Sequence, residues 1–272
     1  MIMDAERRLV FARSLTTALL FSIVVFPVVV FVMLSFVSRV AVLEGVIGST
    51  VFTLRHYQQL FDRVDVAKVL TDSLLIATIS SLVAMSLGLF VAYFVSRGKG
   101  LLPNRLYSLA LTLWFVPSVA LSAQLYFWFQ DIGLYDRAFG MILLYSVTNA
   151  SLVVILLAPY LDATPRRMDE AAWMDGLRGS SVVWRVVAPA ILPALEGVAI
   201  LAFLMSWNEL LYASLLSDRR VTTLPVAMLG LTTGSHIEWG QIAALGTLSL
   251  LPISAAILFI NRNWVRSSST TM

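Results

Sequence analysis

The chain has 272 residues, of which 59% are hydrophobic and only 13% are charged, and its mean hydropathy is +0.86. Soluble domains of this size carry about a quarter charged residues, so the composition excludes a soluble fold and predicts an all-α integral membrane protein in a lipid bilayer. The net charge of +3 comes from arginines at the ends of apolar runs rather than on one clustered face, which argues against a nucleic-acid partner.

Metal and thiol chemistry are not expected in this chain. It has no cysteine, which excludes disulfides, thiolate metal sites and cysteine catalysis. The two histidines, His56 and His236, share no metal-ligand spacing, and we expect both to be solvated loop residues. No metal or cofactor site is therefore predicted within the chain.

Six apolar runs are long enough to cross a bilayer, which takes about 20 residues. The first run follows a basic N-terminal stretch and lacks the short apolar core and cleavage site of a signal peptide, so we expect a retained helix. A segment at 52–61, rich in aromatic residues and leucine, is expected to form a short helix at the membrane surface. The six predicted spans are residues 14–37, 70–95, 106–130, 138–160, 190–216 and 239–261.

The longest polar interruption in the second half of the chain runs from Thr164 to Pro193, and we call it the elbow. It predicts two short helices around a glycine turn. Thr164 is suited to cap the first helix, and Gly176 is suited to end it. Ser180 or Ser181 is suited to cap the second helix, which prolines then terminate.

Small residues in the elbow favour close contact with another molecule. Ala171, Ala172 and Gly176 leave little side chain on part of its surface. Another backbone can approach such a surface closely, so the elbow is predicted to be a docking site.

The distribution of basic residues predicts the orientation. With a cytoplasmic N-terminus, twelve basic residues fall in cytoplasmic segments and seven in outer ones, and this excess inside favours cytoplasmic termini and a cytoplasmic elbow. The twelve are Arg7, Arg8, Arg13, Arg97, Lys99, Arg105, Arg166, Arg167, Arg178, Arg185, Arg262 and Arg266, and the seven are Arg39, Arg55, Arg63, Lys68, Arg137, Arg219 and Arg220.

One motif in the elbow resembles a known family. The run Glu170-Ala171-Ala172-Trp173-Met174-Asp175-Gly176 is similar to the E-A-A-x-x-D-G core of ABC importer permeases, in which prolines follow at the spacings of Pro189 and Pro193. The segments S-W-N-E-L-L at 206–211, T-L-P-V-A at 223–227 and W-G-Q-I-A-A-L at 239–245 resemble the maltose-type branch. That branch imports oligosaccharides, sugar alcohols and glycerol phosphates. The ending V-R-S-S-S-T-T-M departs from the glycine-rich tail common in the branch.

The resemblance implies a six-helix type I importer permease fold (MetI-like), with a permease core at 70–262, an N-terminal region at 1–69 and a short tail at 263–272. It implies a bacterial or archaeal inner membrane, a second homologous permease as partner, a dimer of cytoplasmic ABC ATPases, and an extracytoplasmic solute-binding protein. The elbow is then the coupling helix that seats on the ATPase, through Glu170, Ala171, Ala172, Asp175, Gly176 and Pro189. ATP and magnesium belong to the partner ATPase, because this chain has no glycine-rich phosphate loop ending in Lys and Ser/Thr. The chain itself is therefore not expected to be an enzyme.

The roles of several residues have two possible interpretations from the sequence. Glu170 either anchors the elbow, through backbone donors or a partner arginine, or is a solvated carboxylate. Asn208 and Glu209 lie in the fifth predicted span, where polar side chains face a cavity or a protein partner; they line the solute path or bond to the second permease. Trp207 and Tyr212 are packing or membrane-belt residues, or platforms on which sugars stack.

Two rival functions fit less well. A secondary transporter of a small polar solute is expected to show inverted repeats and broken half-helices with its own ion site, whereas six spans with one large elbow do not match that pattern. An intramembrane enzyme needs paired carboxylates, a histidine cluster or a nucleophile motif, and the spans contain none of these.

Overall fold

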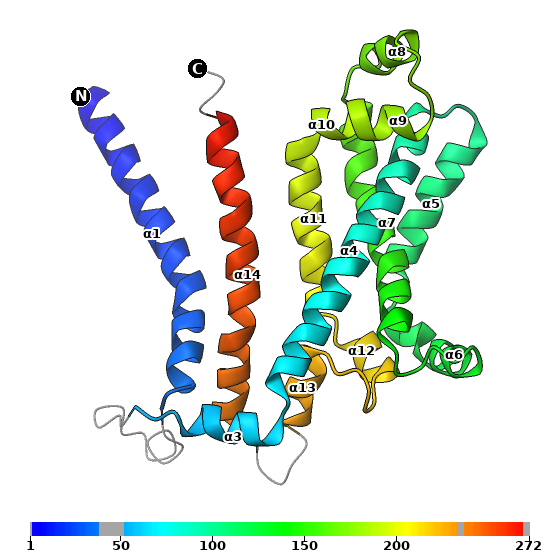
Figure 1. Cartoon of the computed structure of the whole chain (residues 1–272). Helices are drawn as coiled ribbons and strands as arrows, with labels where there is room; N and C mark the ends of the chain where they lie inside the picture. The colour runs from blue at the N-terminus through cyan, green and yellow to red at the C-terminus, as the bar shows by residue number, and fades with distance from the viewer. Residues whose placement is uncertain (1, 38–51, 233–236, 269–272) are drawn as a thin grey trace. The chain divides into compact units, whose positions relative to one another are not determined.

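The computed structural model describes residues 2–37, 52–232 and 237–268 (Figure 1). Within these residues the secondary structure is helical, apart from one antiparallel bridge between Val37 and Phe52. By its internal contacts the chain divides into two compact units. The smaller unit comprises residues 1–66 and 228–253, and the larger unit comprises residues 67–227 and 254–272.

The smaller unit is built from α1 (Ile2–Leu34), the short helix α3 (Arg55–Arg63) and the first part of α14 (Trp239–Ser268). The prediction that His56 is a solvated loop residue is wrong. His56 lies in α3 and is buried, with Nε2 2.9 Å from the carbonyl oxygen of Val37. Its ring packs against Gly240, where a side chain would overlap it. His236 lies outside the described residues.

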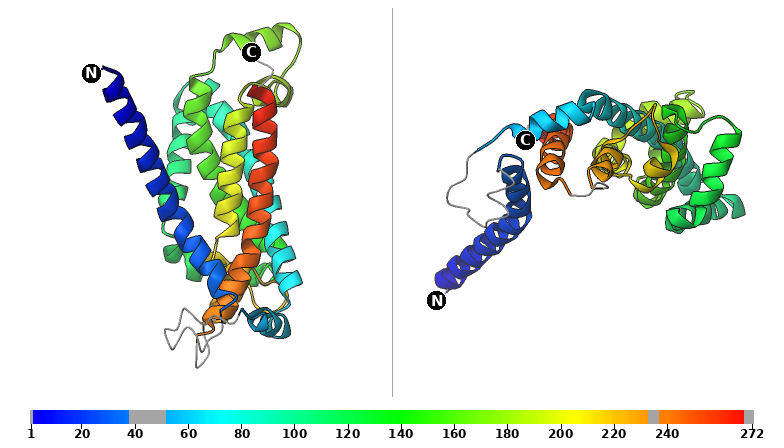
Figure 2. Two further views of the ribbon diagram at one scale, coloured as in Figure 1. Left: turned by 90° about the vertical axis from the view of Figure 1, so that its left-hand side faces the viewer. Right: turned by 90° about the horizontal axis from the view of Figure 1, so that it is seen from below.

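The larger unit is a bundle whose four long helices run side by side in the views of Figures 1 and 2. These are α4 (Val66–Arg97), α5 (Leu101–Phe115), α7 (Ala138–Asp162) and α11 (Leu192–Trp207). The short helices α6 (Ser118–Asp131) and α12 (Leu211–Leu216) lie at one end of this bundle, and α8 (Arg167–Met174) lies at the other. The helix α13 (Leu224–Gly230) follows the loop after α12.

Helix length and hydropathy support membrane-spanning segments. The 25 residues of α7 rise about 37 Å, which exceeds the roughly 30 Å of a bilayer core. Among the described residues, α4 and α7 can each cross alone, and two bent helix pairs raise the number to four. The helices α1 and α14 overlap the two remaining predicted spans, so the structure is consistent with the six-span prediction.

The third predicted span, 106–130, is broken rather than straight. Helices α5 and α6 meet at an angle of 92°. The break falls at Val116 and Pro117, where Val116 takes the extended conformation with φ −66° and ψ 124°. A residue before proline is disfavoured in the helical region, so the W-F-V-P sequence at 114–117 ends the helix.

The fifth predicted span, 190–216, also has different bounds. At its start, Ser180–Ala190 and Leu192–Trp207 are bent by 94° around Ile191. Pro193 has no N–H to donate to the carbonyl four residues earlier, which accounts for a break at this point and agrees with the predicted role of the prolines. At the other end α11 stops at Trp207, and Asn208 and Glu209 lie outside it.

Small residues let α4 pack closely on α7. Ala84, Gly88 and Ala92 recur every four residues along one face of α4, and both alanines are fully buried. A Cβ at Gly88 would lie 2.5 Å from Val153 of α7. Helices in membranes associate through small residues of this kind, because the backbones can then approach each other.

The end of the bundle formed by α6 and α12 is tied together by a carboxylate. Asp136, buried in the turn before α7, accepts hydrogen bonds from the backbone amides of residues 218–221 at 2.9–3.2 Å. The next residues of the same loop are fixed to α4, where Ser73 Oγ accepts a hydrogen bond from the amide of Leu224 at 2.7 Å. The loop after α12 therefore takes its shape from side chains in other parts of the chain, the turn before α7 and helix α4.

Candidate functional site

The elbow forms the two helical segments around a glycine turn that the sequence predicts. Helix α8 ends in a Schellman motif: the amide of Leu177 donates to Ala172 O at 2.9 Å, and the amide of Gly176 donates to Trp173 O at 3.0 Å. Gly176 has φ +82°, a conformation that glycine adopts without steric cost. The second segment consists of α9 (Ser180–Val182), the π-helical η2 (Val183–Val187) and α10 (Ala188–Ala190).

The predicted caps of these segments are wrong. The Thr164 hydroxyl donates back to Tyr160 O at 3.1 Å, so Thr164 finishes the preceding helix α7, and α8 begins only at Arg167. Neither Ser180 nor Ser181 makes a side-chain cap, and Gly179, with φ +55°, precedes α9 instead. The long apolar run of α7 extends to Asp162, and Thr164 follows two residues later as part of the helix end.

A buried ion pair holds α8 to the bundle. Arg97, the last residue of α4, places Nε 2.6 Å from Oδ2 of Asp169, and both side chains are almost completely buried. The same guanidinium donates to Leu161 O at 2.9 Å and to Thr164 O at 3.2 Å. Arg97 therefore joins the end of α7, the link after it and α8 at one point.

A second arginine reinforces this joint. Arg166, just before α8, donates to Ser96 O at 3.0 Å. The apolar side of the elbow also packs on the bundle, where Ala172, Val182 and Val187 share a core cluster with Leu157 and Leu161. Ionic and apolar contacts thus fix the orientation of α8 against α4 and α7.

The predicted coupling residues do not all lie on the surface. Ala171, Asp175, Gly176 and Pro189 are exposed, whereas Ala172 is buried in the core beneath α8. Glu170 is exposed, and its carboxylate forms no hydrogen bond or ion pair with any residue that the structure describes. The internal anchor is its neighbour Asp169. At the tip of α8, Trp173 is 54% and Met174 88% exposed. The elbow therefore presents large apolar side chains together with small ones.

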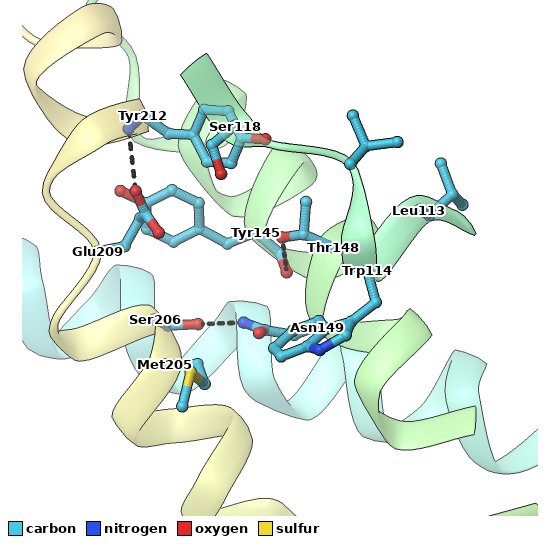
Figure 3. Close-up of a pocket in the computed structure, with 11 residues that line it drawn as sticks. Leu113, Trp114, Ser118, Tyr145, Thr148, Asn149, Met205, Ser206, Glu209 and Tyr212 are labelled. Atoms are coloured by element: carbon cyan, nitrogen blue, oxygen red, sulfur yellow. Dashed lines mark hydrogen bonds between the residues drawn. The ribbon is translucent and has the colours of Figure 1, made fainter. Parts of the chain in front are cut away.

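A pocket of about 160 Å³ lies inside the larger unit, near α6 and α12 (Figure 3). Its walls come from both sides of the break between α5 and α6, from the middle of α7, and from the chain around the end of α11. The lining residues are Leu113, Trp114, Val116, Ser118, Tyr145, Thr148, Asn149, Met205, Ser206, Glu209 and Tyr212.

The structure separates the two predicted path residues. Glu209 lines the pocket, and its Oε1 accepts a hydrogen bond from the amide of Tyr212 at 3.0 Å in the first turn of α12. Asn208 is exposed, does not line the pocket, and donates from Nδ2 to Leu204 O at 2.9 Å. Trp207 is buried and stacks on Phe203 with ring centroids 5.7 Å apart, which is a packing role.

Most pocket residues were not predicted from the sequence, and three of them carry polar or aromatic groups of interest. Trp114, Tyr145 and Asn149 lie within apolar runs and belong to no motif. The one signal for Asn149 is an amide side chain within a span, and its Nδ2 donates to Ser206 Oγ at 2.7 Å. For Trp114 the signal is the proline three positions later, which breaks the helix and brings the ring to a pocket wall.

Residues 84–268 match the family described as the binding-protein-dependent transport system inner membrane component. The chain belongs to this family, and it is a non-catalytic permease subunit of an ABC transporter that resides in a membrane. The helical bundle agrees with that class.

Individual relatives refine the comparison. The chain is 32% identical over 222 residues to the trehalose transport system permease protein SugB of Mycobacterium tuberculosis, covering 80% of this chain and 81% of that protein. It is 30% identical over 196 residues to the trehalose/maltose transport system permease protein MalG of Thermococcus litoralis, covering 70% and 69%. The fold is similar to a chain of a bacterial ABC transporter involved in the import of the acidic polysaccharide alginate, with a TM-score of 0.72, 17% identity, and coverage of 95% and 97%.

Proposed function

We propose that this chain is one of two permeases that together form the membrane path of an ATP-driven importer for a carbohydrate or related solute. The family match and the relatives named for trehalose and maltose support the solute class. A binding protein delivers the solute from outside, and a dimer of ABC ATPases acts from the cytoplasm. Both termini and the elbow lie on the cytoplasmic side, as the basic residues suggest.

The observation that carries this proposal is the rigid attachment of α8. A coupling element transmits motion only if it is stiff and firmly joined to the helices that it moves. The Arg97–Asp169 pair and the Schellman closure at Gly176 meet that requirement. The exposed residues Trp173 and Met174 at the tip are apolar groups suited to a groove on a partner.

Within this function we assign ATPase coupling to Glu170, Ala171, Asp175, Gly176 and Pro189, with Ala172 acting from beneath as a packing residue. Glu209 is assigned to the solute path. Asn208, exposed at the end of α11, is assigned to the surface that meets the second permease.

The absence of cysteine offers a direct test. Met174→Cys in the complete importer, paired with single cysteines scanned over the ATPase, should give one crosslinked position that blocks solute-stimulated ATP hydrolysis until it is reduced. Gly197→Cys, on α11 away from the elbow, is the matched control and should not crosslink. Failure of Met174→Cys to crosslink at any scanned position would contradict the docking role.

The solute class is tested separately with the same complex. The complex is reconstituted in liposomes and the binding protein is added. ATP hydrolysis should then rise with at least one carbohydrate from a panel of sugars and polyols. If none of these carbohydrates stimulates ATP hydrolysis and the complex instead takes up another class of solute, the carbohydrate assignment is wrong.

A further inference from the structure

The pocket inside the larger unit contains a buried polar group, the Tyr145 hydroxyl, that is not satisfied by the protein itself. Tyr145 is 1% exposed, and its hydroxyl has no hydrogen-bond partner among the described residues. Figure 3 shows its ring extended beside Glu209 in the pocket wall. Buried hydroxyls are normally hydrogen-bonded, so an unpaired one that lines a cavity indicates a ligand or water there.

The polar side chains of Asn149, Ser206 and Glu209 in the pocket are held in place by the protein. Asn149 is fixed by its hydrogen bond to Ser206, and Ser206 is also 2.9 Å from Ser80 Oγ. Glu209 is fixed through Oε1 by the amide of Tyr212. Such a preorganised set loses little conformational entropy when a ligand binds.

The pocket also has an aromatic wall. Figure 3 shows the Trp114 ring beside Asn149, on the α5 side of the helix break. One water molecule needs about 10–15 Å³, and the pocket encloses about 160 Å³. An aromatic face with nearby hydroxyl, amide and carboxylate groups suits a compact ring that carries many hydroxyls.

The charge of the pocket is one-sided. Glu209 carries the only carboxylate among the described lining residues, and no arginine or lysine accompanies it. A solute with a carboxylate or phosphate would meet this negative charge at short range without a compensating cation, and such repulsion is strong away from water.

We propose that this pocket is a subsite for neutral polyhydroxylated solutes, which binds one sugar ring through Trp114, Tyr145, Asn149 and Glu209 and rejects anionic sugars. The proposal rests on the proposed function and narrows it, since glycerol phosphates and uronic acids are then excluded at the permease itself. Selection at this point is independent of the selection made by the binding protein.

The test uses glucose and glucuronate, in which a carboxylate replaces the hydroxymethyl group of glucose. The sample is the detergent-solubilised complex of both permeases and the ATPase dimer, without the binding protein. Saturation-transfer NMR should detect contact for glucose and at least tenfold less for glucuronate. Glu209→Gln should raise the glucuronate signal severalfold relative to the glucose signal, because it removes the charge that repels the anion. Glu196→Gln, the same substitution on α11 outside the pocket, should change neither.

A second variant separates binding from structure. Tyr145→Phe removes a hydroxyl without a protein partner, so the melting temperature of the complex should not fall, while glucose binding should weaken about tenfold. Unchanged glucose binding would mean that the pocket holds water only. Equal signals for both probes in the native complex, or no signal for either, also overturn the proposal. Sugar-stimulated ATP hydrolysis is measured with the binding protein present. It can therefore support the proposed function even if the NMR experiment contradicts the subsite.

Discussion

Arg97 and Asp169, the last residue of one long helix and a residue of the first turn of α8, meet in a buried ion pair with Nε 2.6 Å from Oδ2. Among the residues described, no other ion pair joins the elbow to the bundle. The motif residue Glu170 points to solvent, whereas its neighbour provides the attachment. The joint therefore depends on a residue that lies beside the recognisable motif.

Asp169→Asn should destabilise the complex by about 3–5 kcal/mol, because it leaves the Arg97 guanidinium buried without its counter-charge. The measurement is the melting temperature of the solubilised complex, together with the ratio of solute uptake to ATP hydrolysis, which should fall. The double variant Arg97→Met, Asp169→Leu should recover most of the stability, since paired apolar replacement removes both charges.

The control for this variant is Asp162→Asn, which removes an exposed carboxylate at the end of α7. It should change the free energy of unfolding by less than about 0.5 kcal/mol and so leave the melting temperature nearly the same. Equal stability of Asp169→Asn and Asp162→Asn would show that the pair does not hold the elbow.

Substitution of Gly176 should act through backbone conformation alone. Its φ is +82°, and a Cβ at this position would meet no atom within 4 Å. Asn tolerates this conformation better than β-branched residues do, so Gly176→Asn should retain most solute-stimulated ATP hydrolysis, while Gly176→Val should lose most of it with the protein still in the membrane. Gly197→Val, at an open helical position, is the matched control.

Asp136→Asn should release the loop at 218–221. A carboxylate accepts all four amide hydrogens, whereas the NH₂ group of asparagine faces donors that it cannot satisfy. The cost at pH 7 should be about 1.5–3 kcal/mol or more, the value for hydrogen bonds to a charged group. Trypsin cleavage after Arg219 or Arg220 in the solubilised complex should become faster, and unchanged cleavage would contradict the role of Asp136.

The same carboxylate predicts a pH dependence. Burial by itself raises the pKa of Asp136, but the amides of residues 218–221 outweigh it and hold that pKa below its ordinary value. A lowered pKa stabilises the fold fully above the unfolded pKa of about 3.9, and this stabilisation is lost as pH falls through the folded pKa. The difference in melting temperature between native protein and Asp136→Asn should thus stay constant from pH 7 to 5 and shrink below pH 4.

Gly88→Ala should weaken the contact between α4 and α7. The added Cβ would lie 2.5 Å from Val153 and 3.0 Å from Ala150 O, so the helices must separate, at a cost of about 1–3 kcal/mol. The melting temperature of the complex is the measurement. Gly197→Ala, with open space around it, should be neutral or slightly stabilising, and a similar loss in both variants would argue against close packing.

Hydropathy and motif spacing predicted much of this architecture. The apolar runs located α4 and α7 within a few residues, and the elbow showed its two helical segments and its glycine stop. These features are local, because they depend on residues that are close together in the sequence.

The features that were missed depend on distant parts of the chain. Arg97 was counted only as a basic residue that reports topology, since nothing near it in sequence shows that Asp169 will approach. No residue near Asp136 in the sequence shows its role, because its partners are amides that follow α12. The predicted third span overlooked Pro117, whose effect on Val116 is local but is masked in an average of hydropathy.

The position of the pocket between two interrupted helices has a consequence for transport. One wall belongs to the break at Val116 and Pro117, and the opposite wall belongs to the break after Trp207. A change of angle at the first break must alter the distance between Trp114 and Ser118, and a change at the second must alter the distance between Met205 and Glu209. Since a ligand shifts a conformational equilibrium by the difference in its affinity for the two states, a bound solute and the bend of these helices are thermodynamically linked, and each one reports the state of the other.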